Sequence, residues 1–156
     1  MNRAIYAGSF DPITNGHVHI AKCGLEDFDL IIIAIATNFG KKHQFSASQR
    51  IILAEDAFKE YDNIVIQNWQ YAICPLWARM NNSRILIRGI RNIEDEKYEE
   101  KLAKWNHFFG VQNQYYQTTD ELREVSSSRV RKSINTKKWE QAVDLVPNAA
   151  LLHTMV

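Results

Sequence analysis

A short stretch near the start of the chain contains the residues best suited to bind a phosphate group. Gly8 and Gly16 bracket it, Pro12 stiffens it and His17 ends it. Glycine permits backbone conformations closed to other residues and lets a ligand approach the main chain closely. A helix that begins here would add unpaired amides with a partial positive charge, beside a histidine able to donate to an anion. The residues alone also fit a purely structural turn that ends in a capping histidine.

Three further stretches carry cations or hydroxyls suited to phosphate oxygens. They are the loop with Lys41 and Lys42, the Arg-Gly-Ile-Arg run of residues 88–91, and the serines of residues 126–128 with two arginines close behind. Arginine offers a planar fork of donors, lysine a compact charge, and a serine-rich helix start both hydroxyls and free amides. Taken singly, each stretch also fits a solvated loop, a surface ion pair or a helix cap. Together they predict a site for a polyphosphate.

The elements that would position these stretches alternate between strands and helices. Leu30–Ala36 is an unbroken apolar run, which is typical of a strand covered on both faces of a parallel sheet. We expect strands at residues 4–7, 30–36, 64–66, 84–88 and 111–118. We expect helices at residues 17–26, 46–58, 71–80, 92–109, 126–132, 139–143 and 149–155. The pattern predicts an α/β fold: a single Rossmann-like domain over residues 1–156, with an open five-stranded parallel sheet flanked by helices. Ligands bind such sheets at the carboxyl ends of the strands.

The composition of the chain limits the kinds of partner that it is expected to bind. A net charge of +1 over 156 residues offers no broad basic surface for nucleic acid. Cys23 and Cys74 have no second cysteine at metal or redox spacing, so we expect two reduced thiols in a cytoplasmic protein. The longest apolar run is far too short to cross a bilayer, so we expect no membrane partner.

The glycine-containing stretch resembles a known sequence signature. Residues 8–17, Gly-Ser-Phe-Asp-Pro-Ile-Thr-Asn-Gly-His, resemble the signature of the nucleotidylyltransferase superfamily, with its (His/Thr)-x-Gly-His motif at residues 14–17. Within that superfamily the chain resembles the phosphopantetheine adenylyltransferase family. The resemblance implies transfer of the adenylyl group of ATP to 4′-phosphopantetheine, with Mg²⁺, giving dephospho-coenzyme A and pyrophosphate. It also implies a homohexamer.

The same resemblance assigns roles to individual residues and assigns no metal ligand to the chain. The catalytic residues it implies are His17, Lys41 and Arg91. Those it implies for ATP are Ser9, Phe10, His17, Gly89, Ile90, Arg91, Glu99, Ser126, Ser127 and Ser128. Those it implies for the acceptor are Ser9, Lys41, Cys74, Arg88 and Asn106.

Several positions depart from the family pattern, among them His19, residues 95–99 and two further segments. Residues 72–76 replace a leucine pair beside the acceptor, and residues 122–125 lack the aromatic residues expected before the serines. Two other functions therefore stay open. One is a nucleotidylyltransferase with another phosphate acceptor, and the other is a nucleotide-binding module without turnover. We expect that Trp69 and Trp77 lie either at subunit contacts or in the core.

Overall fold

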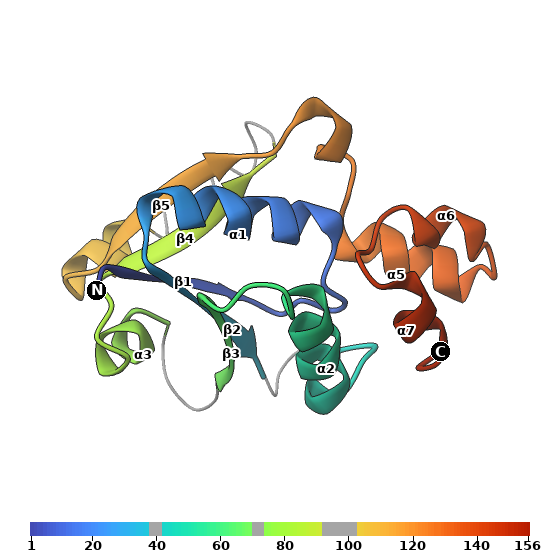
Figure 1. The fold of residues 1–156 in the computed structure, drawn as a ribbon, viewed down its shortest axis with the longest axis horizontal. Helices are drawn as coiled ribbons and strands as arrows, with labels where there is room; N and C mark the ends of the chain where they lie inside the picture. Colours follow the sequence, from blue (N-terminus) through green and yellow to red (C-terminus); the bar gives the residue numbers. More distant parts are fainter. Residues whose placement is uncertain (38–41, 70–73, 92–102) are drawn as a thin grey trace.

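The sheet predicted from the sequence is present and entirely parallel. A computed structural model describes residues 1–37, 42–69, 74–91 and 103–156 (Figure 1). The strands are β1 (Arg3–Gly8), β2 (Leu30–Ala36), β3 (Ile64–Trp69), β4 (Ile85–Ile90) and β5 (Gln112–Gln117). Their order in space is β3-β2-β1-β4-β5, and every neighbouring pair is parallel. The predicted α/β class with five parallel strands is confirmed.

Strand β3 is longer than residues 64–66, which was the sequence expectation. Gln67, Asn68 and Trp69 continue the ladder by pairing with the last three residues of β2. Polar side chains fit there because β3 is an edge strand and only one of its sides is paired. Similarly, β4 extends past Arg88 through Gly89 and Ile90, which pair with β5.

The helices follow the predicted alternation, with shifted ends. They are α1 (Asn15–Asp27), α2 (Ala47–Ala57), α3 (Cys74–Met80), the 3-10 helix η1 (Asp120–Leu122), α5 (Ser127–Asn135), α6 (Glu140–Val143) and α7 (Ala149–His153). Residues 103–108 are also helical. The starts of two expected helices, at residues 71 and 92, lie outside the described residues. Helix α5 runs beyond residue 132 to Asn135, with Ser126 as its N-cap and Thr136 as its C-cap.

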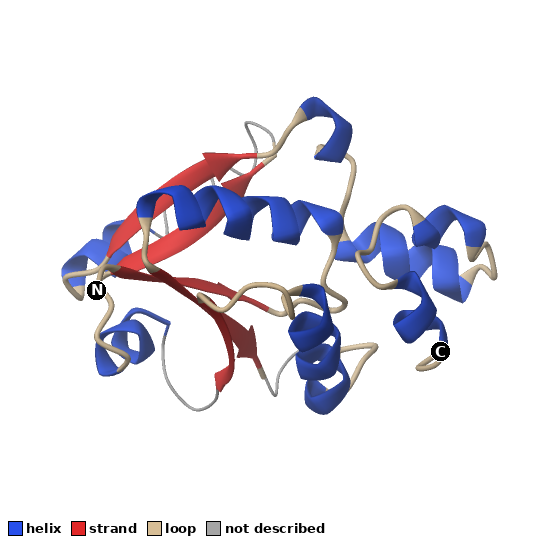
Figure 2. Cartoon of the chain, in the orientation of Figure 1, coloured by secondary structure: helices blue, strands red, loops and turns tan. Residues whose placement is uncertain are grey.

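Helices pack on both faces of the sheet, as Figure 2 shows. The larger core joins alternate residues of the central strands, among them Tyr6 and Ile33, to α1, α2 and the three C-terminal helices. The smaller core joins the intervening residues, among them Ile5 and Ile32, to α3. This alternation follows from the two-residue period of a strand. Trp69 and Trp77 are half-buried against the smaller core, with ring centroids 6.3 Å apart.

Within the described residues, the longest apolar helical segment falls short of what a bilayer crossing needs.

Candidate active site

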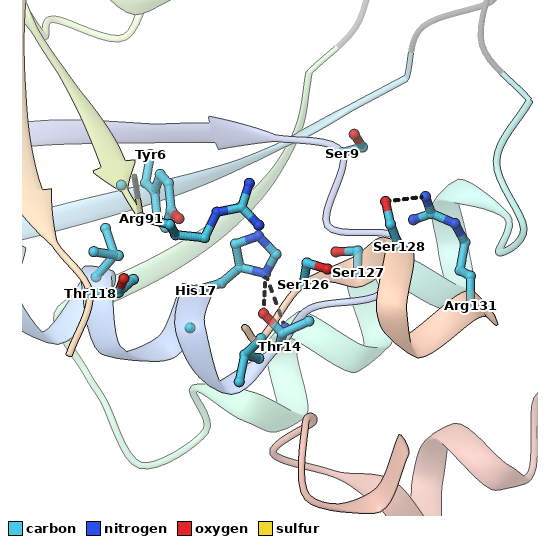
Figure 3. Close-up of a pocket in the computed structure, with 14 residues that line it drawn as sticks. Tyr6, Ser9, Thr14, His17, Arg91, Thr118, Ser126, Ser127, Ser128 and Arg131 are labelled. Atoms are coloured by element: carbon cyan, nitrogen blue, oxygen red, sulfur yellow. Dashed lines mark hydrogen bonds between the residues drawn. The ribbon is translucent and has the colours of Figure 1, made fainter. Parts of the chain in front are cut away.

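A cavity of about 270 Å³ opens where β1 and β4 end and where α1 and α5 begin (Figure 3). Its walls come from four separate segments: strand β1 with its following turn, the start of α1, the end of β4, and the chain from β5 to α5. The lining residues are Tyr6, Ser9, Thr14, Gly16, His17, Ile20, Gly89, Arg91, Thr118, Val125, Ser126, Ser127, Ser128 and Arg131. The sequence predicted a site at the carboxyl ends of the strands, and the cavity lies there.

His17 is held in one tautomer. The backbone N–H of Thr14 donates to its Nδ1 at 3.1 Å, and the Thr14 hydroxyl lies 3.0 Å from the same atom. Because a backbone N–H can only donate, Nδ1 is the acceptor and Nε2 carries the proton. Burial lowers the pKa of His17 to about 4, with a further lowering by the positive charge of Arg91. His17 is therefore a neutral donor at neutral pH.

The serines at the start of α5 use their hydroxyl groups to shape the site. Ser126 caps the helix by accepting from the backbone N–H of Arg129 at 3.2 Å. Ser127 donates its hydroxyl to the Pro12 carbonyl at 2.7 Å, and Ser128 accepts from Arg131 at 3.1 Å. The backbone amides of the first helical turn have no acceptor within the helix. The start of α5 is therefore suited to an anion through its amides and dipole.

Two buried charged residues hold the turn between β1 and α1 in place. The Asp11 carboxylate accepts from the backbone N–H groups of Gln44 and Phe45, at 3.0 and 2.9 Å. Arg50, 1% exposed, donates to the carbonyls of Ser9, Ala36 and Phe45. These contacts join the ends of β1 and β2 to the start of α2.

Most of the ATP-binding residues predicted from the sequence meet in this cavity. Ser9, His17, Gly89, Arg91 and Ser126–Ser128 line it. Phe10 lies behind it instead: its ring is 3% exposed and packs edge-on against His17, with centroids 5.0 Å apart. Phe10 thus supports the imidazole from the core side. Ile90 lies at the end of β4 and accepts from the Thr118 N–H, without lining the cavity.

Among the acceptor residues that the structure describes, Ser9 lines the cavity, whereas Cys74, Arg88 and Asn106 do not. Cys74 begins α3 and packs against the smaller core. Asn106 is 4% exposed and donates to the Asn113 side chain at 2.8 Å, so its amide has a structural use. Arg88 pairs with Tyr115 in the β4–β5 ladder. Lys41 and Glu99 lie outside the described residues.

The sequence analysis gave no binding role to three polar residues of the cavity: Tyr6, Thr14 and Thr118. Tyr6 has the pattern of a core aromatic in a first strand, and Thr118 that of a residue ending an ordinary strand. Arg131 lay inside a stretch singled out for its basic character, and its guanidinium donates to the Asp11 carbonyl at 2.5 Å. Thr14 stood in the predicted motif without a role and proves to be the residue that orients His17.

This chain is similar in sequence and in fold to several known proteins. Residues 5–133 match the Cytidylyltransferase-like family. Two curated relatives are named phosphopantetheine adenylyltransferase. The one from Desulfatibacillum aliphaticivorans is 43% identical over 66% of this chain and 58% of its own length. The one from Syntrophotalea carbinolica is 38% identical over 70% of this chain and 65% of its own length. The matched region thus spans less than two thirds of either relative.

Solved structures share the fold. TmcAL from Thermotoga maritima, crystallised with alpha-thio ATP, superposes with a TM-score of 0.67 at 15% identity, covering 99% of this chain and 55% of TmcAL. The lipopolysaccharide core biosynthesis protein from Thermoplasma volcanium superposes with a TM-score of 0.56 at 21% identity, covering 76% of this chain and 97% of that protein. The family resemblance read from residues 8–17 is confirmed, and this chain belongs to the Cytidylyltransferase-like family.

Proposed function

We propose that this chain transfers the adenylyl group of ATP to 4′-phosphopantetheine, giving dephospho-coenzyme A and pyrophosphate. One observation carries the proposal: a neutral histidine donor, a nearby arginine and the start of α5 all line the same cavity. These are groups that bind a polyphosphate and stabilise charge at a reacting phosphorus. The names of the two curated relatives support adenylyl transfer to phosphopantetheine in particular.

The roles of the residues follow from their chemistry. Phosphoryl-type transfer needs little covalent chemistry from the protein, so positioning and fixed positive charge supply the catalysis. His17 would donate through Nε2 to the α-phosphate as negative charge develops on it. Arg91 would neutralise the same group, and the amides at Ser127 and Ser128 would hold the departing pyrophosphate. As the family resemblance implies, Lys41 and Arg88 would bind the phosphate of the acceptor.

Magnesium would enter with the nucleotide. Among the described residues, no group of three or more histidine, cysteine, aspartate or glutamate side chains is placed to hold a metal ion. The phosphate oxygens of ATP are themselves ligands for Mg²⁺. The ion would thus be held mainly by the substrate and would reduce the repulsion between phosphates as the acceptor approaches.

The proposal is tested by measuring pyrophosphate release with ATP and Mg²⁺, with and without 4′-phosphopantetheine. We expect release that depends on the acceptor and falls by about two to four orders of magnitude in His17→Ala, because the donor to the α-phosphate is lost. His107→Ala removes an exposed histidine outside the cavity and should leave the rate unchanged.

The other functions left open by the sequence have distinct outcomes in this experiment. Release that needs a different phosphate acceptor would identify another nucleotidylyltransferase, and the departures at residues 72–76 would be its cause. ATP binding without any release would identify a non-catalytic nucleotide-binding module. Undiminished turnover in His17→Ala would remove the catalytic role of that residue.

We also propose that the protein works in the cytoplasm as a homohexamer. The support for the assembly is the family resemblance, together with exposed aromatic side chains outside the cavity. Trp105 is 67% exposed and Phe108 79% exposed. Exposed apolar surface of this kind is typical of subunit contacts.

A further inference from the structure

The phenol of Tyr6 is buried at the base of the cavity and has no assigned role. Tyr6 lies on the central strand β1, opposite Ile33 on one side and Ile87 on the other. The residue is only 8% exposed, and its ring packs edge-on against Phe10 with centroids 5.3 Å apart. It nevertheless lines the cavity, and Figure 3 shows its side chain among those of Arg91, His17 and Thr118.

The Tyr6 hydroxyl has no hydrogen-bond partner among the residues that the structure describes. Because Tyr6 lines the cavity, its hydroxyl is left to hydrogen-bond with whatever occupies that cavity, either water or a ligand. The absence of a side chain at Gly89 leaves space beside it: a Cβ there would lie 3.6 Å from the Tyr6 hydroxyl oxygen. The phenol is therefore held in place by its ring while its polar end meets the cavity.

The charges around this hydroxyl favour an anionic ligand. The positive charges of Arg88 and Arg91 both act to lower the pKa of the Tyr6 phenol. The centroids of the Tyr6 and His17 rings lie 6.2 Å apart. Burial outweighs the two arginines and raises the pKa of Tyr6 far above its ordinary value of 10.0. The hydroxyl thus keeps its proton at neutral pH and can donate it to an oxygen anion.

We propose that the Tyr6 hydroxyl donates a hydrogen bond to a phosphate oxygen of the bound nucleotide, beside His17 and Arg91. This inference rests on the proposed function, and it names a ligand-binding residue that neither the motif nor the resemblance had pointed to. It places three donors around one phosphate group: a neutral imidazole, a neutral phenol and a guanidinium. The phosphate would accept the hydrogen bond of a phenol that has no acceptor among the described residues.

The test compares the unaltered chain with Tyr6→Phe in calorimetric titrations with MgATP and with inorganic tripolyphosphate. The substitution removes one oxygen and keeps the ring that packs against Phe10. A hydrogen bond to a charged acceptor is among the stronger ones, so we expect both ligands to bind about tenfold or more weakly. Tyr61→Phe is the matched control, because Tyr61 packs against Phe58 outside the cavity. It should bind both ligands as the unaltered chain does.

Each result decides the inference. Equal affinities of Tyr6→Phe and the unaltered chain for both ligands would overturn it. Weaker ATP binding with unchanged tripolyphosphate binding would also overturn it, because the hydroxyl would then contact the nucleoside. These titrations need no acceptor and no turnover. An absence of pyrophosphate release would therefore defeat the proposed function while leaving the Tyr6 result readable. Failure of the unaltered chain to bind either ligand would overturn both.

Discussion

His17 shows how a residue can be adapted to donate without carrying charge. Its ring lies between Phe10 and the cavity, and Thr14 supplies the hydrogen bond that fixes Nδ1 as the acceptor. A charged imidazole would add attraction for phosphate in the ground state as well as in the transition state. In the proposed reaction, a neutral imidazole held in place would give its hydrogen bond where charge develops, which is the interaction that lowers a barrier.

The low pKa of His17 predicts a pH dependence of stability. The unfolded chain binds a proton on this residue below its ordinary pKa of 6.5, whereas the folded chain does so only near pH 4. The free energy of unfolding therefore falls by about 3 kcal/mol in total as the pH drops from about 6.5 to about 4. Urea unfolding at several pH values should show a flatter dependence in His17→Gln.

Its control is His107→Gln, which removes an exposed histidine. That variant should keep the dependence of the unaltered chain. An unchanged slope in His17→Gln would mean that other groups, and not His17, cause the loss of stability in acid.

At the scale of elements, helix α1 contains two glycines with different surroundings. Gly24 lies against the sheet, and Gly16 lines the cavity. A Cβ at Gly24 would lie 2.7 Å from Ile87 Cδ1 and 3.1 Å from Ile31 Cδ1, inside a packed core. A Cβ at Gly16 would meet nothing closer than 3.7 Å. The first glycine therefore serves packing, and the second lines the ligand cavity without a packing requirement.

Alanine at these two positions should have opposite effects. Gly24→Ala should lower the free energy of unfolding by about 1–2 kcal/mol, because overpacking outweighs the gain in helix propensity. Gly16→Ala should fold with at least the original stability and bind ATP more weakly. Denaturant unfolding and ATP titration separate the two effects. Equal stabilities of the two variants would contradict this packing account.

Arg50 holds three elements together by satisfying three backbone carbonyls from within the core. Arg50→Met would leave those carbonyls without their donor and would remove one of the positive charges near Asp11, which keeps Arg131 at 3.7 Å. We expect a loss of about 3–5 kcal/mol in unfolding free energy, because three buried carbonyls lose the donor that satisfies them. Arg79→Met, at an exposed arginine, should cost little. A loss of similar size in both variants would show that the buried position of Arg50 carries no special weight.

Much of this arrangement could be predicted from the sequence, and the rest depends on contacts between distant segments. The apolar run of β2 and the residues at the start of α1 are local signals. They were enough to predict the parallel sheet and a phosphate site at the start of α1. Tyr6 and Arg50 have no local signal, because a buried tyrosine and a helical arginine are common outside binding sites. Their roles arise only when Gly89, Ser9 and Ala36 are brought to them by the fold.

At the scale of the whole molecule, the cavity is formed by segments that lie far apart in the sequence. Ser127 donates to the carbonyl of Pro12, and Arg131 donates to that of Asp11, more than a hundred residues earlier. Farther along, Asn15 donates to the Leu145 carbonyl and Asn148 to that of Leu53. The C-terminal helices thus fix the α5 start against the turn after β1. The site is complete only when the whole domain has folded.

The helical residues 103–108 lie at the end of the molecule away from α5–α7 (Figure 1). Trp105 and Phe108 project from one side of this helix, three residues apart, and with Lys104 they line a shallow hollow. If this surface forms the subunit contact of a hexamer, Trp105→Glu combined with Phe108→Glu should reduce the mass found by sedimentation. ATP binding should persist, since neither residue lines the cavity. Val143→Glu, at an exposed apolar residue of α6, should leave the mass unchanged. A monomeric mass for the unaltered chain would remove the hexamer, whereas a hexamer that survives both glutamates would assign the contact to a different face.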